Sequence, residues 1–123
     1  MEKRRWEQII AAGLLLYPAA LVGSFWVTWW VAGQALGHAP RPSLDDPKFI
    51  NDLVSAFHFG TTVMLLLLPG FAVGSLAFGL SALWSRADAS RRLLVASSAA
   101  LLMTGAVLLL RADPYRIVTW FMD

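Results

Sequence analysis

The chain has 123 residues and a mass of 13.5 kDa; 58% of the residues are hydrophobic and only 15% are charged. Ordinary soluble domains contain about 25% charged residues, and a chain this short needs a large polar surface to stay folded in water. The composition therefore excludes a monomeric soluble globule and predicts a membrane protein. The sequence contains no cysteine, which excludes disulfides and thiolate metal ligands.

Charged residues divide the sequence into three long uncharged runs, which cover residues 8–40, 53–85 and 93–110. A hydrocarbon core of about 30 Å is crossed by about 20 helical residues, whereas isolated strands would leave their backbone groups unpaired in lipid. We therefore predict an all-α membrane protein whose single transmembrane domain, residues 1–123, has helices at about 7–33, 47–85 and 92–111. The first run is expected to be a retained signal anchor, because no small-residue cleavage site follows its apolar core. Pro18 within this run predicts a kink or a local break.

The basic residues favour an N-terminus in the cytoplasm, because six of them then lie inside and four outside, as the positive-inside rule requires. The inner set is Lys3, Arg4, Arg5, Arg86, Arg91 and Arg92, and the outer set is Arg41, Lys48, Arg111 and Arg116. Tryptophans favour the headgroup level, and they occur near both predicted ends of the helices: Trp6 and Trp84 inside, Trp26, Trp29 and Trp30 outside. We expect a multi-pass protein of the cytoplasmic (inner) membrane with its C-terminus outside. The net charge of +2 reflects this topology and does not indicate nucleic-acid binding.

Two Asp-Pro pairs predict helix starts on the outer side. An aspartate caps free N–H groups and a proline suits the first helical position. Asp46 and Pro47 therefore predict that the second helix begins at Pro47, several turns beyond the hydrocarbon. Asp113 and Pro114 likewise predict a short interfacial helix over about 114–122. We expect the linker, the projecting part of the second helix and the tail to form a small cap on the outer side.

Small residues on the second helix predict close helix packing, either within the molecule or between molecules. They are Gly70, Gly74, Ala77 and Ser81, and Pro69 before them predicts a bend. The sequence shows no nucleophile motif and no charge within the three runs, so neither an enzyme nor an ion carrier is expected. The expected function is that of an accessory or scaffold component, with the lipid bilayer and other membrane subunits, or a second copy, as partners.

Two alternatives involve the titratable residues near the outer side. Three helices in about 120 residues match the size of the membrane anchors of succinate dehydrogenase, which carry an axial histidine; here His58 and Ser55 would contact a haem or a quinone. Alternatively, His38, His58, Asp45 and Asp46 would form an outer-face metal site, because imidazole and carboxylate groups are common ligands. Their spacing matches no standard metal motif, and the simpler interpretation makes His58 part of a polar helix stripe and the aspartates caps. We therefore expect no cofactor.

The loop carries the clearest motif in the chain, Pro-Arg-Pro-Ser-Leu-Asp-Asp-Pro at residues 40–47, within the segment 36–48. With Asp113-Pro114-Tyr115 and Trp120-Phe121 it resembles a group of small uncharacterised bacterial membrane proteins that have three helices and a Pro-x-Pro-Ser-Leu-Asp-Asp-Pro loop. The resemblance is strongest over about thirteen residues. It implies a three-helix architecture and no activity, cofactor or site residue.

Overall fold

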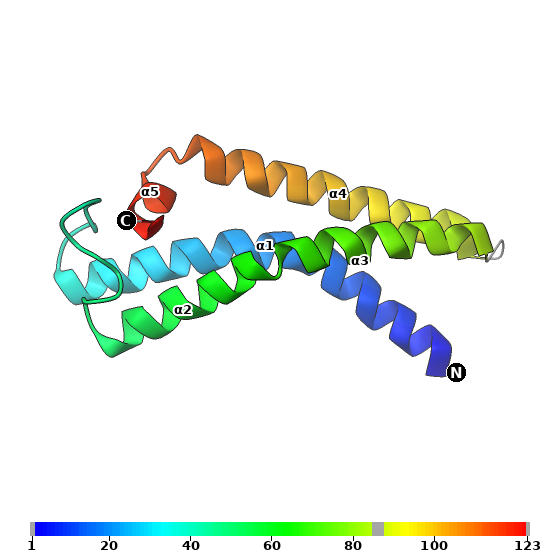
Figure 1. Ribbon diagram of the computed structural model, residues 1–123, viewed down its shortest axis with the longest axis horizontal. Helices are drawn as coiled ribbons and strands as arrows, with labels where there is room; N and C mark the ends of the chain where they lie inside the picture. The colour runs from blue at the N-terminus through cyan, green and yellow to red at the C-terminus, as the bar shows by residue number, and fades with distance from the viewer. Residues whose placement is uncertain (1, 85–87, 123) are drawn as a thin grey trace. The chain divides into compact units, whose positions relative to one another are not determined.

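The computed structural model describes residues 2–84 and 88–122, except for the side chain of Lys3. Within these ranges the regular structure is entirely helical (Figure 1), which confirms the all-α prediction there. The elements are α1 (Glu2–Leu36), α2 (Asp52–Leu66), α3 (Leu68–Leu80), the 3₁₀-helix η1 (Ser81–Trp84), α4 (Ala89–Ala112) and α5 (Ile117–Met122). Helices α1 and α4 are each long and apolar enough to cross a membrane, and α2 with the following helical segment passes the same test as a pair. The predicted end of the second helix at residue 85 and the inner charge of Arg86 lie outside the described residues.

Prolines affect the two long predicted helices differently. The sequence predicted either a kink or a local break at Pro18. Helix α1 is uninterrupted through Pro18, so the break does not occur. The second predicted helix is interrupted at Leu67, and Pro69 lies in the first two positions of α3. A backbone N–H at these positions would have no intrahelical acceptor, so proline, which lacks an N–H, lets a helix restart there at little cost.

The chain divides into two compact units, of which the first comprises Met1–Ala20 and Leu67–Ala106. In this unit the rings of Tyr17 on α1 and Phe71 on α3 stack with centroids 4.9 Å apart. A Cβ atom built on Gly79 would lie 3.1 Å from the Cβ of Ala96. Gly79 therefore allows α3 and α4 to approach closely, as small residues do between membrane helices.

The second unit comprises Leu21–Leu66 and Val107–Asp123, and α5 packs at its centre. Trp120 and Phe121 of α5 are buried, and the Phe121 ring lies 4.6 Å from the ring of Phe25 on α1. Helix α2 lies beside the C-terminal part of α1 (Figure 1), where the buried hydroxyls of Thr28 and Thr61 form a hydrogen bond of 3.1 Å. Six helical residues in α5 would not be stable alone, so burial of its aromatic side chains holds the tail in place.

The second helix begins at Asp52, five residues later than predicted. The side-chain oxygen of Asn51 accepts a 2.8 Å hydrogen bond from the backbone N–H three residues later and caps the helix. The carboxylate of Asp46 instead accepts the N–H two residues later at 2.9 Å, which closes a local turn. Pro47 is buried in this loop. The prediction that Asp46 and Pro47 start the helix is therefore wrong, because a second capping residue follows them and the aspartate forms a turn.

The tail helix α5 begins at Ile117, three residues after the predicted start at Pro114. Pro114 instead lies in an exposed turn between α4 and α5. The carboxylate of Asp113 spans this turn and accepts hydrogen bonds from the N–H of Val118 at 2.9 Å and from the N–H and hydroxyl of Thr119 at 2.8 and 2.6 Å. Asp113 thus caps α5 from four residues before its first residue.

Candidate functional site

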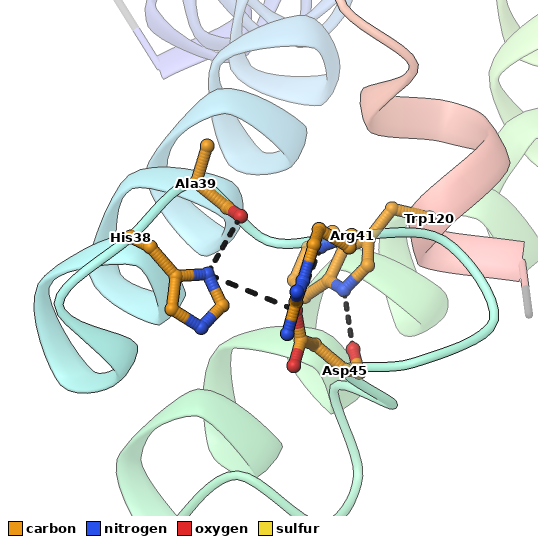
Figure 2. Close-up of polar contacts among 5 residues, drawn as sticks. All are labelled: His38, Ala39, Arg41, Asp45 and Trp120. Carbon is orange, nitrogen blue, oxygen red and sulfur yellow. Dashed lines mark hydrogen bonds and ion pairs between the residues drawn. The ribbon is translucent and has the colours of Figure 1, made fainter.

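The loop between α1 and α2 is organised around the carboxylate of Asp45 (Figure 2). Its Oδ2 accepts the backbone N–H of Arg41 at 2.9 Å and lies 3.3 Å from the Nε of the same residue. The Nδ1 of His38 lies 3.9 Å from this oxygen and 2.9 Å from the carbonyl oxygen of Ala39. On the backbone side, the indole N–H of Trp120 donates to the carbonyl of Asp45. The loop and the tail helix are thus joined through one residue.

Hydrogen bonding favours the ionised form of the Asp45 carboxyl. The backbone N–H of Arg41 lowers the pKa of Asp45 below its usual value, and the guanidinium and His38 act in the same direction against the opposing effect of burial. The pKa of Asp113 is also lowered: burial raises it, but the hydrogen bonds from the hydroxyl and N–H of Thr119 and from neighbouring N–H groups together outweigh burial. Both carboxylates therefore act as charged anchors for backbone N–H groups.

The residues predicted as metal ligands do not gather at one point. His38 and Asp45 lie together, whereas Asp46 is 3.9 Å from the ammonium of Lys48. His58 contacts the tail helix instead. Across residues 2–84 and 88–122, no three histidine, aspartate or glutamate side chains form a group that could hold a metal ion.

The predicted cofactor residues, His58 and Ser55, both lie half-buried on α2. The Nε2 of His58 is 3.3 Å from the carbonyl oxygen of Phe121, and the two rings lie 4.3 Å apart. The N–H of Ser55 donates to the carbonyl of Asn51 in the first turn of the helix, and no hydrogen bond joins Ser55 to His58 in the described part of the chain. The imidazole therefore helps to fix α5 against α2.

The first unit contains a part-buried ion pair that the sequence analysis missed. Nη2 of Arg92 on α4 lies 2.6 Å from Oε1 of Glu7 on α1, and its Nη1 donates to the carbonyl and hydroxyl oxygens of Ser81 at 3.1 and 3.2 Å. Arg92 is only 8% exposed. The pair could have been expected from the sequence, because Glu7 directly precedes the first uncharged run and Arg92 directly precedes the third. Both residues therefore lie on the predicted inner side of the membrane.

Of the residues predicted to form a small-residue face, three are exposed on the helix surface and the fourth makes a hydrogen bond within the chain. Gly70, Gly74 and Ala77 are exposed on α3, and a Cβ built on either glycine meets no atom within 4 Å. Ser81 instead lies in η1, where its hydroxyl donates to the carbonyl of Phe78. The close internal contact of α3 is made by a different glycine, at position 79.

Comparison of the chain with protein-family models, with curated proteins and with solved structures finds no match. What the protein does is therefore inferred from its own residues.

Proposed function

We propose that the protein crosses the cytoplasmic membrane three times, through α1, the α2–α3 pair and α4, with α5 as an interfacial helix. The length and apolar character of these helices support this assignment. Large apolar side chains also point outward along the three spans, including Leu16, Val73 and Leu101 at 66%, 68% and 74% exposure. Lipid would cover such surfaces. The resemblance of the Pro-x-Pro-Ser-Leu-Asp-Asp-Pro loop to that of small three-helix bacterial proteins supports the same architecture.

Two tryptophans of α1 support a specific position of this helix across the membrane. Trp6 and Trp26 are separated by 20 residues of uninterrupted helix, which corresponds to about 30 Å, the thickness of a hydrocarbon core. The bond between Thr28 and Thr61 would then place the first turns of α2 beyond the hydrocarbon. With the N-terminus in the cytoplasm, as the basic residues favour, the loop, the start of α2 and α5 form a cap on the outer side.

We infer that the protein acts as an accessory or scaffold component by packing against another membrane helix. The observation that carries this inference is the open face of α3 formed by Gly70, Gly74 and Ala77. Contact with lipid chains does not require small residues. Close contact with a neighbouring helix does, because small residues spaced four apart on one helix face let the two backbones approach each other. The partner is a helix of another membrane subunit or of a second copy.

The experiment replaces the open glycines by leucine, as Gly70→Leu and Gly74→Leu, and compares the variants with Gly105→Leu on α4. A Cβ at Gly105 also meets nothing within 4 Å, but its neighbours four residues away are Leu101 and Leu109. We expect the wild type, gently solubilised and cross-linked, to run at a mass above the monomer. Gly70→Leu and Gly74→Leu should shift it to the monomer, while Gly105→Leu should behave as the wild type.

Two results would overturn this proposal. One is a wild-type protein that is strictly monomeric and co-purifies with nothing under mild conditions. The other is a larger assembly that survives both α3 substitutions unchanged.

A further inference from the structure

The chain crosses the border between the two compact units three times, once in each proposed span. The crossings lie between Ala20 and Leu21 in α1, between Leu66 and Leu67 where α2 ends, and between Ala106 and Val107 in α4. Leu21 is five residues before Trp26 on the same helix, which places it about 8 Å below the outer edge of the hydrocarbon in the proposed placement. The crossing in α1 therefore lies within the membrane.

Both prolines that lie within helices are found at these crossings. Pro18 is the third residue before the border in α1, and Pro69 is the third residue after it, at the start of α3. The other four prolines of the chain lie in loops or turns. Because proline has no N–H, neither Pro18 nor Pro69 can donate to the carbonyl four residues earlier, that of Leu14 or of Leu65. A helix bends most readily where such a hydrogen bond is missing.

The third crossing, in α4, contains a glycine in place of a proline. Gly105 is the second residue before the border, and a Cβ built on it meets no atom within 4 Å, so no close neighbour in the described part of the chain requires a glycine there. Glycine destabilises a helix by about 1 kcal/mol relative to alanine, because its backbone has more freedom to lose. The hydroxyl of Thr104 also donates to the carbonyl of Ala100 at 2.8 Å. A side chain that bonds back to a helical carbonyl in this way weakens and bends the helix.

Each unit has contacts of its own that a bend at the crossings would leave intact. The first unit contains the ion pair between Glu7 and Arg92, at 2.6 Å. The second contains the buried hydrogen bond between Thr28 and Thr61, at 3.1 Å. A bend within either unit would strain such contacts, whereas a bend at the three crossings falls where the helices are weakest.

We propose that the three crossings form a hinge about which the two units change their relative orientation. Every span carries a residue that weakens the helix within three positions of the border: Pro18, Pro69 and Gly105. A few residues of this kind are enough to absorb the backbone changes of a hinge. The open face of α3 belongs to the first unit and the cap to the second, so the hinge would let the cap reorient while a partner stays packed on α3. This last consequence rests on the proposed function, whereas the hinge itself does not.

Distances between pairs of spin labels, measured by double electron–electron resonance in lipid vesicles, test the hinge. Each label is placed on an introduced cysteine, because the natural chain has none, and excess unlabelled protein restricts the signal to pairs within one chain. Leu44→Cys/Arg91→Cys places one label in each unit, and Leu44→Cys/Tyr115→Cys places both in the second unit; all three positions are exposed. Helix α2 has 15 residues and is about 22 Å long, so a change in bend of about 20° moves its far end by about 8 Å. We expect the distance distribution of the first pair to be wider than that of the second by about this amount.

The hinge is stiffened by Pro69→Ala, which restores a backbone N–H, together with Gly105→Ala, which extends into open space. Pro69 is exposed, so neither substitution removes a buried side chain. We expect this double variant to narrow the distribution of the pair at 44 and 91 to the width of the pair within one unit. Ala20→Gly, at an exposed position beside the border, should widen it, because glycine loosens the helix. The matched control is Gly13→Ala/Pro114→Ala, a glycine with equally open space and an exposed proline, both away from the border, which should leave the width unchanged.

The hinge would be overturned if the two label pairs give equally narrow distributions in the wild type. It would also be overturned if the stiffened variant and its control narrow the distribution equally, or if neither stiffening nor Ala20→Gly changes the width. These measurements do not involve the partner face of α3. A strictly monomeric protein with a wide distribution would therefore overturn the proposed function and support the hinge, and a larger assembly with a narrow distribution would do the reverse.

Discussion

Replacing Arg92 by alanine tests how much the part-buried ion pair between Arg92 and Glu7 stabilises the first unit. Arg92 is 8% exposed, its Nη2 is 2.6 Å from Glu7, and its Nη1 holds the carbonyl of Ser81 at 3.1 Å. Removing one member of a buried pair costs about 3–5 kcal/mol, because the other charge is left unpaired. The Glu7 side chain is 21% exposed, so water reaches it, and we expect the lower end of that range, about 3 kcal/mol.

The assay is reversible unfolding in mixed micelles of rising dodecyl sulfate content, followed by circular dichroism. Arg91→Ala is the matched control, because Arg91 is the exposed neighbour and both substitutions remove one basic residue from the same end. We expect Arg91→Ala to change the free energy of unfolding by less than about 0.5 kcal/mol. The apolar double variant Glu7→Leu/Arg92→Met should be less destabilised than the sum of its single variants, since neither charge is left alone.

The reasoning would be refuted if Arg92→Ala and Arg91→Ala unfold at the same dodecyl sulfate content. It would also fail if the double variant loses the full sum of the two single losses. Either result would mean that the pair is not coupled in the folded protein.

Four further substitutions, in three experiments, test the second unit. The pKa of Asp113 is lowered on folding, so its stabilisation of α5 should be present above the unfolded pKa of about 3.9 and lost as pH falls through the folded value. Amide exchange in the tail should therefore depend on pH in the wild type, and Asp113→Asn should remove that dependence. A pH profile that the substitution leaves unchanged would contradict the capping role of Asp113. Trp120→Phe should cost about 1 kcal/mol by leaving the carbonyl of Asp45 without its donor, seen as faster amide exchange in the loop, and unchanged exchange would count against that bond. Thr28→Val and Thr61→Val should show a coupling energy of about 0.6 kcal/mol in a double-mutant cycle, whereas strict additivity would exclude their hydrogen bond.

The positions of the helices could be predicted from charge and hydropathy, because these depend on local composition. Their boundaries could be predicted less well. Asp46 and Asn51 are both good caps and lie five residues apart, and only the buried position of Pro47 and the turn at Asp46 decide between them. The start of α5 lies at Ile117 and not at Pro114 for a different reason: the carboxylate of Asp113 spans a turn and caps the helix from four residues before it.

The contacts of the candidate sites depend on packing between distant segments, which local patterns do not encode. Glu7 and Arg92 are 85 positions apart, and His58 and the carbonyl of Phe121 are 63 apart. Spacing within one helix identified His58 as polar but could not show that its partner is the tail helix.

Single-cysteine labelling measures the membrane topology most directly, because the natural chain contains no cysteine. Leu44→Cys, Tyr115→Cys and Arg91→Cys place a thiol at exposed positions in the loop, before α5 and at the start of α4. In intact cells a membrane-impermeant maleimide should label positions 44 and 115, and position 91 only after permeabilisation. Labelling of 44 and 115 from opposite sides, or of 91 from the same side as 44, would contradict the three-span account.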